Sequence, residues 1–123
     1  MVTLKNDKLT VEIANYGAEV KSIKTADGVE YVWQGGGEFW EGTAPNLFPI
    51  VGRLYEQTYT LDGEKYTLGC HGFGWISDFN LVENTENSAV FELKSNKEIK
   101  KSLLEAAQKL VDKQMITLDS VSE

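Results

Sequence analysis

Two residues of types suited to binding and to proton chemistry occur once each in the chain, and each stands beside a glycine. Arg53, the only arginine, follows Gly52, and His71, the only histidine, precedes Gly72. Arginine offers a fixed fork of donors for carboxylates or neighbouring sugar hydroxyls, and histidine exchanges a proton near neutral pH. Both residues are therefore candidates for a binding or catalytic site. The alternative is that Arg53 pairs with a surface carboxylate and that His71 caps a turn.

The residues around this pair do not predict a cofactor or a metal site. Cys70 is the only cysteine, so the chain has no internal disulfide, and with one histidine beside it we expect no metal site from this chain. Adjacent residues on a strand point to opposite faces, which argues against Cys70 and His71 as a catalytic pair. The glycines at 35–37 lack the pattern of a phosphate-binding loop and predict a turn.

Aromatic residues accompany both candidates. The two longest stretches without strand alternation cover residues 34–52 and 69–77, and loops of this length on a small β scaffold are often functional. Aromatic side chains at this density most often form core, but an aromatic face also stacks on the C–H side of a sugar ring. We therefore add Trp40 and Phe73 to the candidates for a pocket lining.

Alternation of polar and apolar residues predicts the strands that would position these loops. Asp-Gly pairs at 27–28 and 62–63 separate alternating runs and indicate hairpins, because glycine tolerates the positive φ of a type I′ turn. The expected strands cover residues 8–13, 19–24, 29–33, 58–61, 64–68, 79–82 and 89–93. The first part of the chain is therefore expected to be antiparallel β.

The chain changes character near Asn96. Residues 1–96 hold 7 basic and 14 acidic side chains and every aromatic residue and glycine, whereas residues 97–123 hold 5 of each charge. Apolar residues at three- and four-residue steps from Ile99 to Met115 predict an amphipathic helix, which Ser95 and Glu98 would open as a capping box. We therefore expect a β segment over 1–96 and a helical tail over 97–123.

Overall composition excludes several classes of partner. The chain has 123 residues and a net charge of −7, without the Lys/Arg clusters that nucleic acids or anionic membrane surfaces attract. No apolar run approaches the roughly 20 residues of a membrane helix, and the polar start lacks a signal-peptide core. We expect a cytoplasmic protein that binds neither nucleic acid nor membrane.

A set of short blocks in one order resembles the amino-terminal part of the aldose 1-epimerase (galactose mutarotase-like) family. The likeness covers about residues 2–96, and its most specific blocks are Pro45–Leu54 and His71–Phe73. The other blocks are Tyr16–Val20, Glu30–Trp33 and Phe39–Trp40. The resemblance implies a large antiparallel β-sandwich, the galactose mutarotase-like supersandwich, of which this chain would hold an incomplete part.

The resemblance also implies a reaction and a substrate. Members interconvert the α and β anomers of a free aldose by ring opening, which needs one group to take the anomeric proton and another to protonate the ring oxygen. By resemblance, Arg53 and His71 hold the sugar. The family's general base is a glutamate far downstream and its acid a second histidine, and neither has a counterpart here. We expect a truncated member that is inactive alone, with a monosaccharide as its ligand.

Two alternatives remain beside this interpretation. The chain could be a non-catalytic carbohydrate-binding or protein-interaction module, which self-associates through sheet edges or through the helix expected over 99–115. It could also be a disrupted reading frame without a selected function. Conformational entropy offsets most of the hydrophobic gain in so small a sheet protein, so we expect marginal stability or oligomerisation.

Overall fold

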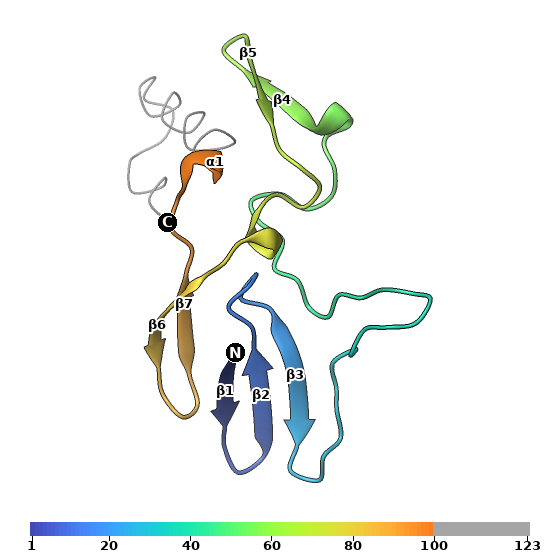
Figure 1. Ribbon diagram of the computed structural model, residues 1–123, viewed down its shortest axis with the longest axis vertical. Coiled ribbons are helices and arrows are strands. Elements are labelled where there is room, and N and C mark those ends of the chain that lie inside the picture. The colour runs from blue at the N-terminus through green and yellow to red at the C-terminus, as the bar shows by residue number, and fades with distance from the viewer. Residues whose placement is uncertain (100–123) are drawn as a thin grey trace.

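The computed structural model describes residues 1–99, and within them the chain is mainly β with antiparallel pairing throughout its named strands. Three separate sheets are present, one of three strands and two of two (Figure 1). The strands are β1 (Val2–Lys5), β2 (Leu9–Ile13), β3 (Val20–Thr25), β4 (Thr58–Leu61), β5 (Glu64–Thr67), β6 (Asn80–Asn84) and β7 (Ala89–Glu92). Two 3-10 turns, η1 (Tyr55–Gln57) and η2 (Gly74–Ile76), lie between them. The mainly β, antiparallel prediction is confirmed for these residues.

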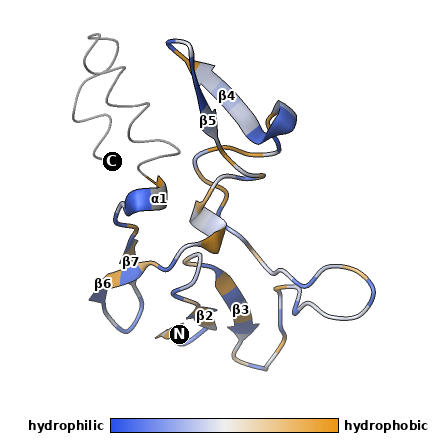
Figure 2. Cartoon of the chain, turned by 45° about the horizontal axis from the view of Figure 1, so that its top comes forward, coloured by the Kyte–Doolittle hydropathy of each residue, from blue (hydrophilic) through white to orange (hydrophobic). Residues whose placement is uncertain are grey.

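The amino-terminal sheet has the order β1-β2-β3. A tight turn joins its first two strands, because the side chain of Asn6 accepts hydrogen bonds from the amides of Lys8 and Leu9, both at 2.8 Å. Along β3 the apolar Val20 and Ile23 are separated by polar residues, which gives the strand hydrophobic and hydrophilic bands (Figure 2). The sequence analysis did not predict β1, although Val2 and Leu4 alternate with polar residues and Val2 is buried.

The β4–β5 hairpin confirms the prediction made from Asp62 and Gly63. Both residues have positive φ, 55° and 80°, as a type I′ turn requires. The register places Tyr59 opposite Tyr66, whose rings stack with centroids 5.2 Å apart. This turn and this aromatic pair stabilise a hairpin that forms its own sheet.

The strands expected over 79–82 and 89–93 form as β6 and β7 and pair as a hairpin. A bulge between Leu81 and Glu83 shifts the register. The amide of Lys5, at the end of β1, donates to the carbonyl of Glu86 in the β6–β7 turn at 2.7 Å. This hydrogen bond ties the third sheet to the first.

The strand predicted over 29–33 is wrong. Only a single bridge joins Lys24 to Glu30. The carboxylate of Glu30 accepts from the amides of Ile23, at 2.9 Å, and Val32, at 3.0 Å, and from the hydroxyl of Ser22. Because this side chain takes the place of a backbone acceptor beside β3, the ladder does not continue.

The described residues end in one short helical segment, α1 (Lys97–Ile99). The amide of Ile99 donates to the side chain of Asn96 at 2.9 Å, so Asn96 caps this turn. The helix predicted over 99–115 otherwise lies outside the described residues. No helix within residues 1–99 is long and apolar enough to cross a membrane.

Little of the described chain forms a core. The buried apolar residues are Val2, Tyr66, Leu68 and Ile99, and no side chain among the described residues is completely enclosed. Large apolar side chains are exposed instead, the most exposed being Phe39 and Tyr55 at 86% each. The sheets therefore lack a shared apolar interior in this part of the chain, and the loops between them position the candidate residues.

Candidate functional site

Three segments far apart in the sequence meet between the sheets, at residues 15–19, 43–53 and 69–79. The first is a turn in which Gly17 and Ala18 have positive φ. It is joined to the third by the amide of Gly17, which donates to Ser77 O at 2.7 Å, and by the amide of Phe79, which donates to Asn15 O at 2.9 Å. Backbone hydrogen bonds thus fix the turn against the end of the 69–79 loop.

Glu19 fixes the start of the 43–53 segment. One carboxylate oxygen accepts from the amides of Thr43 and Ala44, both at 3.0 Å, and from the Thr43 hydroxyl at 2.6 Å. The other oxygen pairs with Lys21 Nζ at 2.6 Å. Burial raises the pKa of the carboxyl group, but these hydrogen bonds outweigh burial and lower the pKa from 4.5 to about 2. A charged carboxylate therefore anchors the loop.

Asn46 and Phe48 hold the middle of the same segment. The Asn46 side-chain amide donates to the carbonyl oxygens of Gly17 and Ala18 at 2.9 and 2.8 Å. The carbonyl of Phe48 accepts from the amides of Phe73 and Gly74 at 2.8 and 3.0 Å. The rings of Phe48 and Phe73 also meet edge to face, with centroids 5.9 Å apart. The 43–53 and 69–79 loops are therefore held together along their length.

Gly72 is the point of closest approach between these two loops. Its φ is +70°, and a Cβ built on it would lie 2.2 Å from Phe48 O and 2.5 Å from Pro49 Cδ. No side chain fits at this distance, and L residues rarely adopt this φ. The glycine beside His71 is thus explained by backbone packing against Phe48.

Two hydrogen bonds join His71 to Gly52. The amide of His71 donates to Gly52 O at 2.8 Å, and the amide of Gly52 donates to His71 Nδ1, also at 2.8 Å. An amide N–H can only donate, so Nδ1 is the accepting, unprotonated nitrogen of the ring. Arg53 follows directly and is exposed. This pairing places Arg53 and His71 on adjoining loops.

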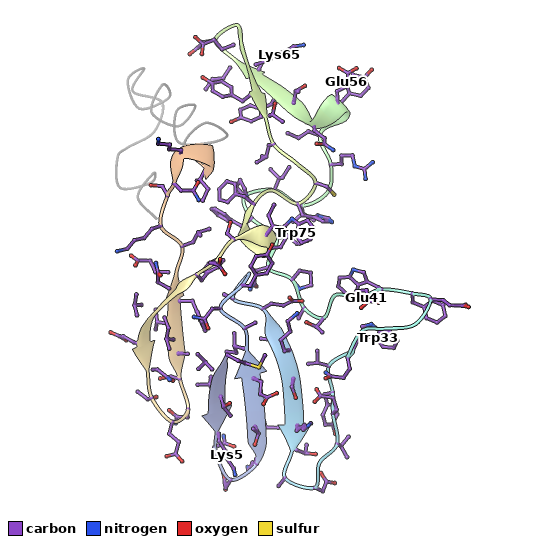
Figure 3. All side chains as sticks on the ribbon, viewed as in Figure 1. Lys5, Trp33, Glu41, Glu56, Lys65 and Trp75 are labelled. Carbon is purple, nitrogen blue, oxygen red and sulfur yellow. The ribbon has the colours of Figure 1, made fainter. Side chains whose placement is uncertain are left out.

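The structure brings together three of the four candidate residues. Arg53, His71 and Phe73 lie on the paired 43–53 and 69–79 loops. Trp40 lies on the loop over residues 34–43, which projects away from the three sheets beside the labelled Trp33 and Glu41 (Figures 1 and 3). Trp33 Nε1 donates to Trp40 O at 2.8 Å, and the Trp40 side chain is 53% exposed. Trp40 is therefore separate from the group around His71 in this structure.

The structure supports the turn-capping alternative for His71 and shows no carboxylate partner for Arg53 within residues 1–99. His71 does cap a turn, through Nδ1, as that alternative predicted. The ion pairs of residues 1–99 join Lys21 to Glu19 and Lys94 to Glu92, and neither includes Arg53. The surface-carboxylate alternative for Arg53 thus has no partner in that range.

Cys70 and His71 do not have the strand geometry that was expected for them. Cys70 and His71 belong to a turn in which His71 has a φ of 63°, so the strand geometry assumed for them does not apply.

Within residues 1–99 no three His, Cys, Asp or Glu side chains gather in a way that would hold a metal ion. A hollow of about 250 Å³ beside the β1–β2 turn is lined by residues that include Lys5 and Thr25 and do not include His71.

Sequence reasoning did not identify the two residues that anchor the site, Glu19 and Asn46. Both lie inside blocks that carried the family resemblance, one in the turn at 16–20 and the other in the stretch from 44 to 54. A polar residue within an otherwise apolar and glycine-rich loop was the available signal. Glu19 stands at the start of the strand expected over 19–24, where a polar residue fits the alternation, and Asn46 lies outside every expected strand, so periodicity singled out neither residue.

Comparisons with a family model, with curated proteins and with solved structures all match this chain to aldose 1-epimerase or galactose mutarotase-like proteins. A family model described as aldose 1-epimerase matches residues 1–102. The chromosomal protein LacX of Lactococcus lactis is 41% identical over 103 residues, which cover 80% of this chain and 34% of LacX. A galactose mutarotase related enzyme from Lactobacillus acidophilus has 43% identity and a TM-score of 0.79 over 82% of this chain and 34% of its own. A galactose mutarotase-like protein from Lactobacillus casei has 36% identity and a TM-score of 0.80, over 83% and 35%. The chain spans about a third of the length of these relatives.

Proposed function

The chain belongs to the aldose 1-epimerase family, and from that premise we propose that residues 1–96 form part of a binding site for a free aldose, in which Arg53 and His71 hold the sugar. The observation that carries the proposal is the paired Gly52 and His71, which sets both polar side chains on adjoining loops. Phe73 contributes an apolar ring beside them. The full site would serve the interconversion of α and β anomers by ring opening.

We propose further that this 123-residue chain does not catalyse the reaction alone. Mutarotation needs a base for the anomeric hydroxyl and an acid for the ring oxygen. The family resemblance assigns these roles to a glutamate and a second histidine further along, and the chain has a single histidine. Residues 1–96 then supply sugar contacts, and the segment over 97–123 is a separate helical tail. A cytoplasmic location, where free aldoses are metabolised, is part of this proposal.

Sugar binding is tested by titrating the chain with galactose and with glucose while the amide NMR signals of the 43–53 and 69–79 loops are followed. We expect the signals of Gly52, Arg53 and Gly72 to shift. Arg53→Gln should weaken binding about tenfold, because it removes a charged donor of fixed geometry. The matched control is Lys65→Gln on the β5 strand, which should leave the affinity unchanged. Equal effects of the two substitutions would refute a sugar site at Arg53.

Catalysis is tested by following the optical rotation of freshly dissolved α-glucose or α-galactose. With the 123-residue chain we expect the rate of buffer alone. A faster rate that disappears in Arg53→Gln would overturn the proposal of inactivity while supporting the site. The two parts of the proposal are therefore tested separately.

A second candidate function, a non-catalytic interaction module, is favoured by the exposed apolar residues. Many large apolar side chains of the described residues are exposed, Phe39 and Tyr55 at 86% each. Where such side chains adjoin, the apolar surface they form marks association sites. Under this alternative the chain self-associates through its sheet edges or through the 97–123 tail. Deleting residues 97–123 should then change the oligomer size or raise aggregation, as measured by light scattering. An unchanged size would count against the tail as the interface.

A further inference from the structure

The two ring nitrogens of His71 have different surroundings. Nδ1 accepts a hydrogen bond from the Gly52 amide at 2.8 Å, while the backbone of His71 donates to Gly52 O at the same distance. A neutral imidazole whose Nδ1 accepts must carry its proton on Nε2. Gly52 thus selects one tautomer and one orientation of the ring.

The loops around this contact resist rearrangement. Gly72 packs against Phe48 O too closely for any side chain, and the carbonyl of Phe48 accepts from two amides of the 69–79 loop. His71 itself has a φ of 63°, a left-handed conformation that turns the side chain back toward Gly52. The imidazole is therefore fixed by backbone groups on both sides of the contact.

We propose that the Gly52 amide is a positioning group that presents His71 to the ligand as a neutral hydrogen-bond donor through Nε2. This inference rests on the proposed function and specifies how the sugar is held. Nδ1 is engaged by the backbone, so the ring has no free acceptor with which to take a proton from the anomeric hydroxyl.

The proposal specifies the chemistry of the ligand atoms. The Arg53 guanidinium has five N–H donors and no acceptor, and Nε2–H of His71 is also a donor. Two donors on adjoining loops suit a ligand edge that presents acceptor oxygens, such as hydroxyl oxygens or the ring oxygen of an aldose. A ligand edge of donors alone would leave both side chains unpaired.

NMR of the ¹⁵N-labelled full chain tests the tautomer directly, and the assignment is unambiguous because His71 is the only histidine. At mildly alkaline pH we expect a protonated Nε2, an unprotonated Nδ1, and a scalar coupling across the hydrogen bond between Gly52 N and His71 Nδ1. Addition of galactose should shift the Nε2 signal and leave the coupling in place. A protonated Nδ1, or the absence of the coupling, would overturn the proposal.

Two substitutions separate the roles of the two nitrogens. His71→Asn places an acceptor oxygen near the position of Nδ1 and tolerates the left-handed backbone, but it has no donor at the position of Nε2. We expect it to keep the loop intact, as read from hydrogen exchange at Gly52, and to weaken sugar binding about tenfold. His71→Gln carries a donor near the position of Nε2 and should recover part of that loss. Wild-type affinity in His71→Asn would refute the donor role.

The outcomes also distinguish this inference from the proposed function. If galactose and glucose shift the Arg53 and Gly72 amides while the Gly52 coupling is absent, the sugar site stands and the positioning role is wrong. If the coupling between Gly52 N and His71 Nδ1 is present but no signal of the 43–53 or 69–79 loop responds to any sugar, the proposed function is wrong. The donor role of His71 toward a sugar is then wrong as well.

Discussion

At position 72 the packing of the chain leaves room for a hydrogen atom and nothing larger. Gly72 has a positive φ and lies against Phe48 O, whereas Gly36 has a positive φ of 94° with nothing within 4 Å of the place that a Cβ would occupy. The two glycines therefore share a positive φ, which would strain any residue with a Cβ, and differ in steric contact. Substituting each by alanine separates these two costs.

We expect Gly72→Ala to lower the free energy of unfolding by about 3 kcal/mol or more, and Gly36→Ala by about 1 kcal/mol, because only the first adds a steric clash to the cost of a positive φ. Urea denaturation of the two variants measures the difference. Gly72→Ala should also release the Gly52 amide to hydrogen exchange. Equal losses in both variants would show that the approach to Phe48 is not limiting.

The carboxylate of Glu19 gives the site a predictable pH response. Its folded pKa of about 2 lies below the ordinary 4.5, so its contribution to stability is complete above the ordinary value. That contribution is lost as pH falls from about 4.5 toward 2. It amounts to about 1–3 kcal/mol, since the carboxylate accepts several hydrogen bonds and is largely buried.

We expect Glu19→Gln to remove this pH dependence, and to lower stability at neutral pH while changing it little near pH 2. Denaturation midpoints of wild type and variant across acidic pH measure the effect. Glu38→Gln, on the exposed 34–43 loop, is the control and should keep the wild-type profile. A wild-type profile in Glu19→Gln would show that another group causes the acid response.

At the scale of elements, local turn chemistry explains which strands form. Asp62 and Gly63 both take positive φ and produce a regular hairpin, whereas Gly28 alone does so at the Asp27–Gly28 turn. There the side chain of Glu30 bonds to the amides of Ile23 and Val32 and replaces a regular ladder. An Asp-Gly pair therefore forms the turn of a regular hairpin at residues 62–63, whereas the pair at residues 27–28 is followed by a single bridge.

We expect Gly63→Ala to destabilise the β4–β5 hairpin by about 1 kcal/mol, because alanine is strained at a φ of 80°. The effect should stay local, since β4 and β5 form a sheet of their own. Hydrogen exchange should accelerate at Tyr59 and Tyr66 and remain unchanged in β6–β7. Acceleration across both hairpins would show that the sheets unfold as one unit.

At the scale of the whole molecule, the described residues form three sheets without a common interior. Large apolar residues at their junction remain half exposed, among them Tyr16 at 52%, Phe48 at 51% and Ile76 at 48%. Proteins with so little enclosed apolar surface gain little hydrophobic stabilisation to offset conformational entropy. The chain also spans about a third of its relatives, which have further chain available to cover such surface.

We expect the isolated chain to bind a hydrophobic dye such as ANS and to unfold over a broad temperature range, with a midpoint that depends on protein concentration. Calorimetry at several concentrations, combined with light scattering, measures this behaviour. A sharp melt of a monomer that is independent of concentration would contradict it.

The sequence by itself determined the antiparallel β character, two of the hairpins, and the family to which the chain belongs. These features are encoded by neighbouring residues, because alternation and Asp-Gly turns act over a few positions. Only the tertiary structure decided that Gly52 engages His71 Nδ1, that Glu19 anchors Thr43, and that the loop over residues 34–43 projects away from the sheets. Each of these depends on hydrogen bonds and packing between segments far apart in the sequence, or on the path of a long loop. No periodicity or motif in one segment specifies the atoms that it meets in another.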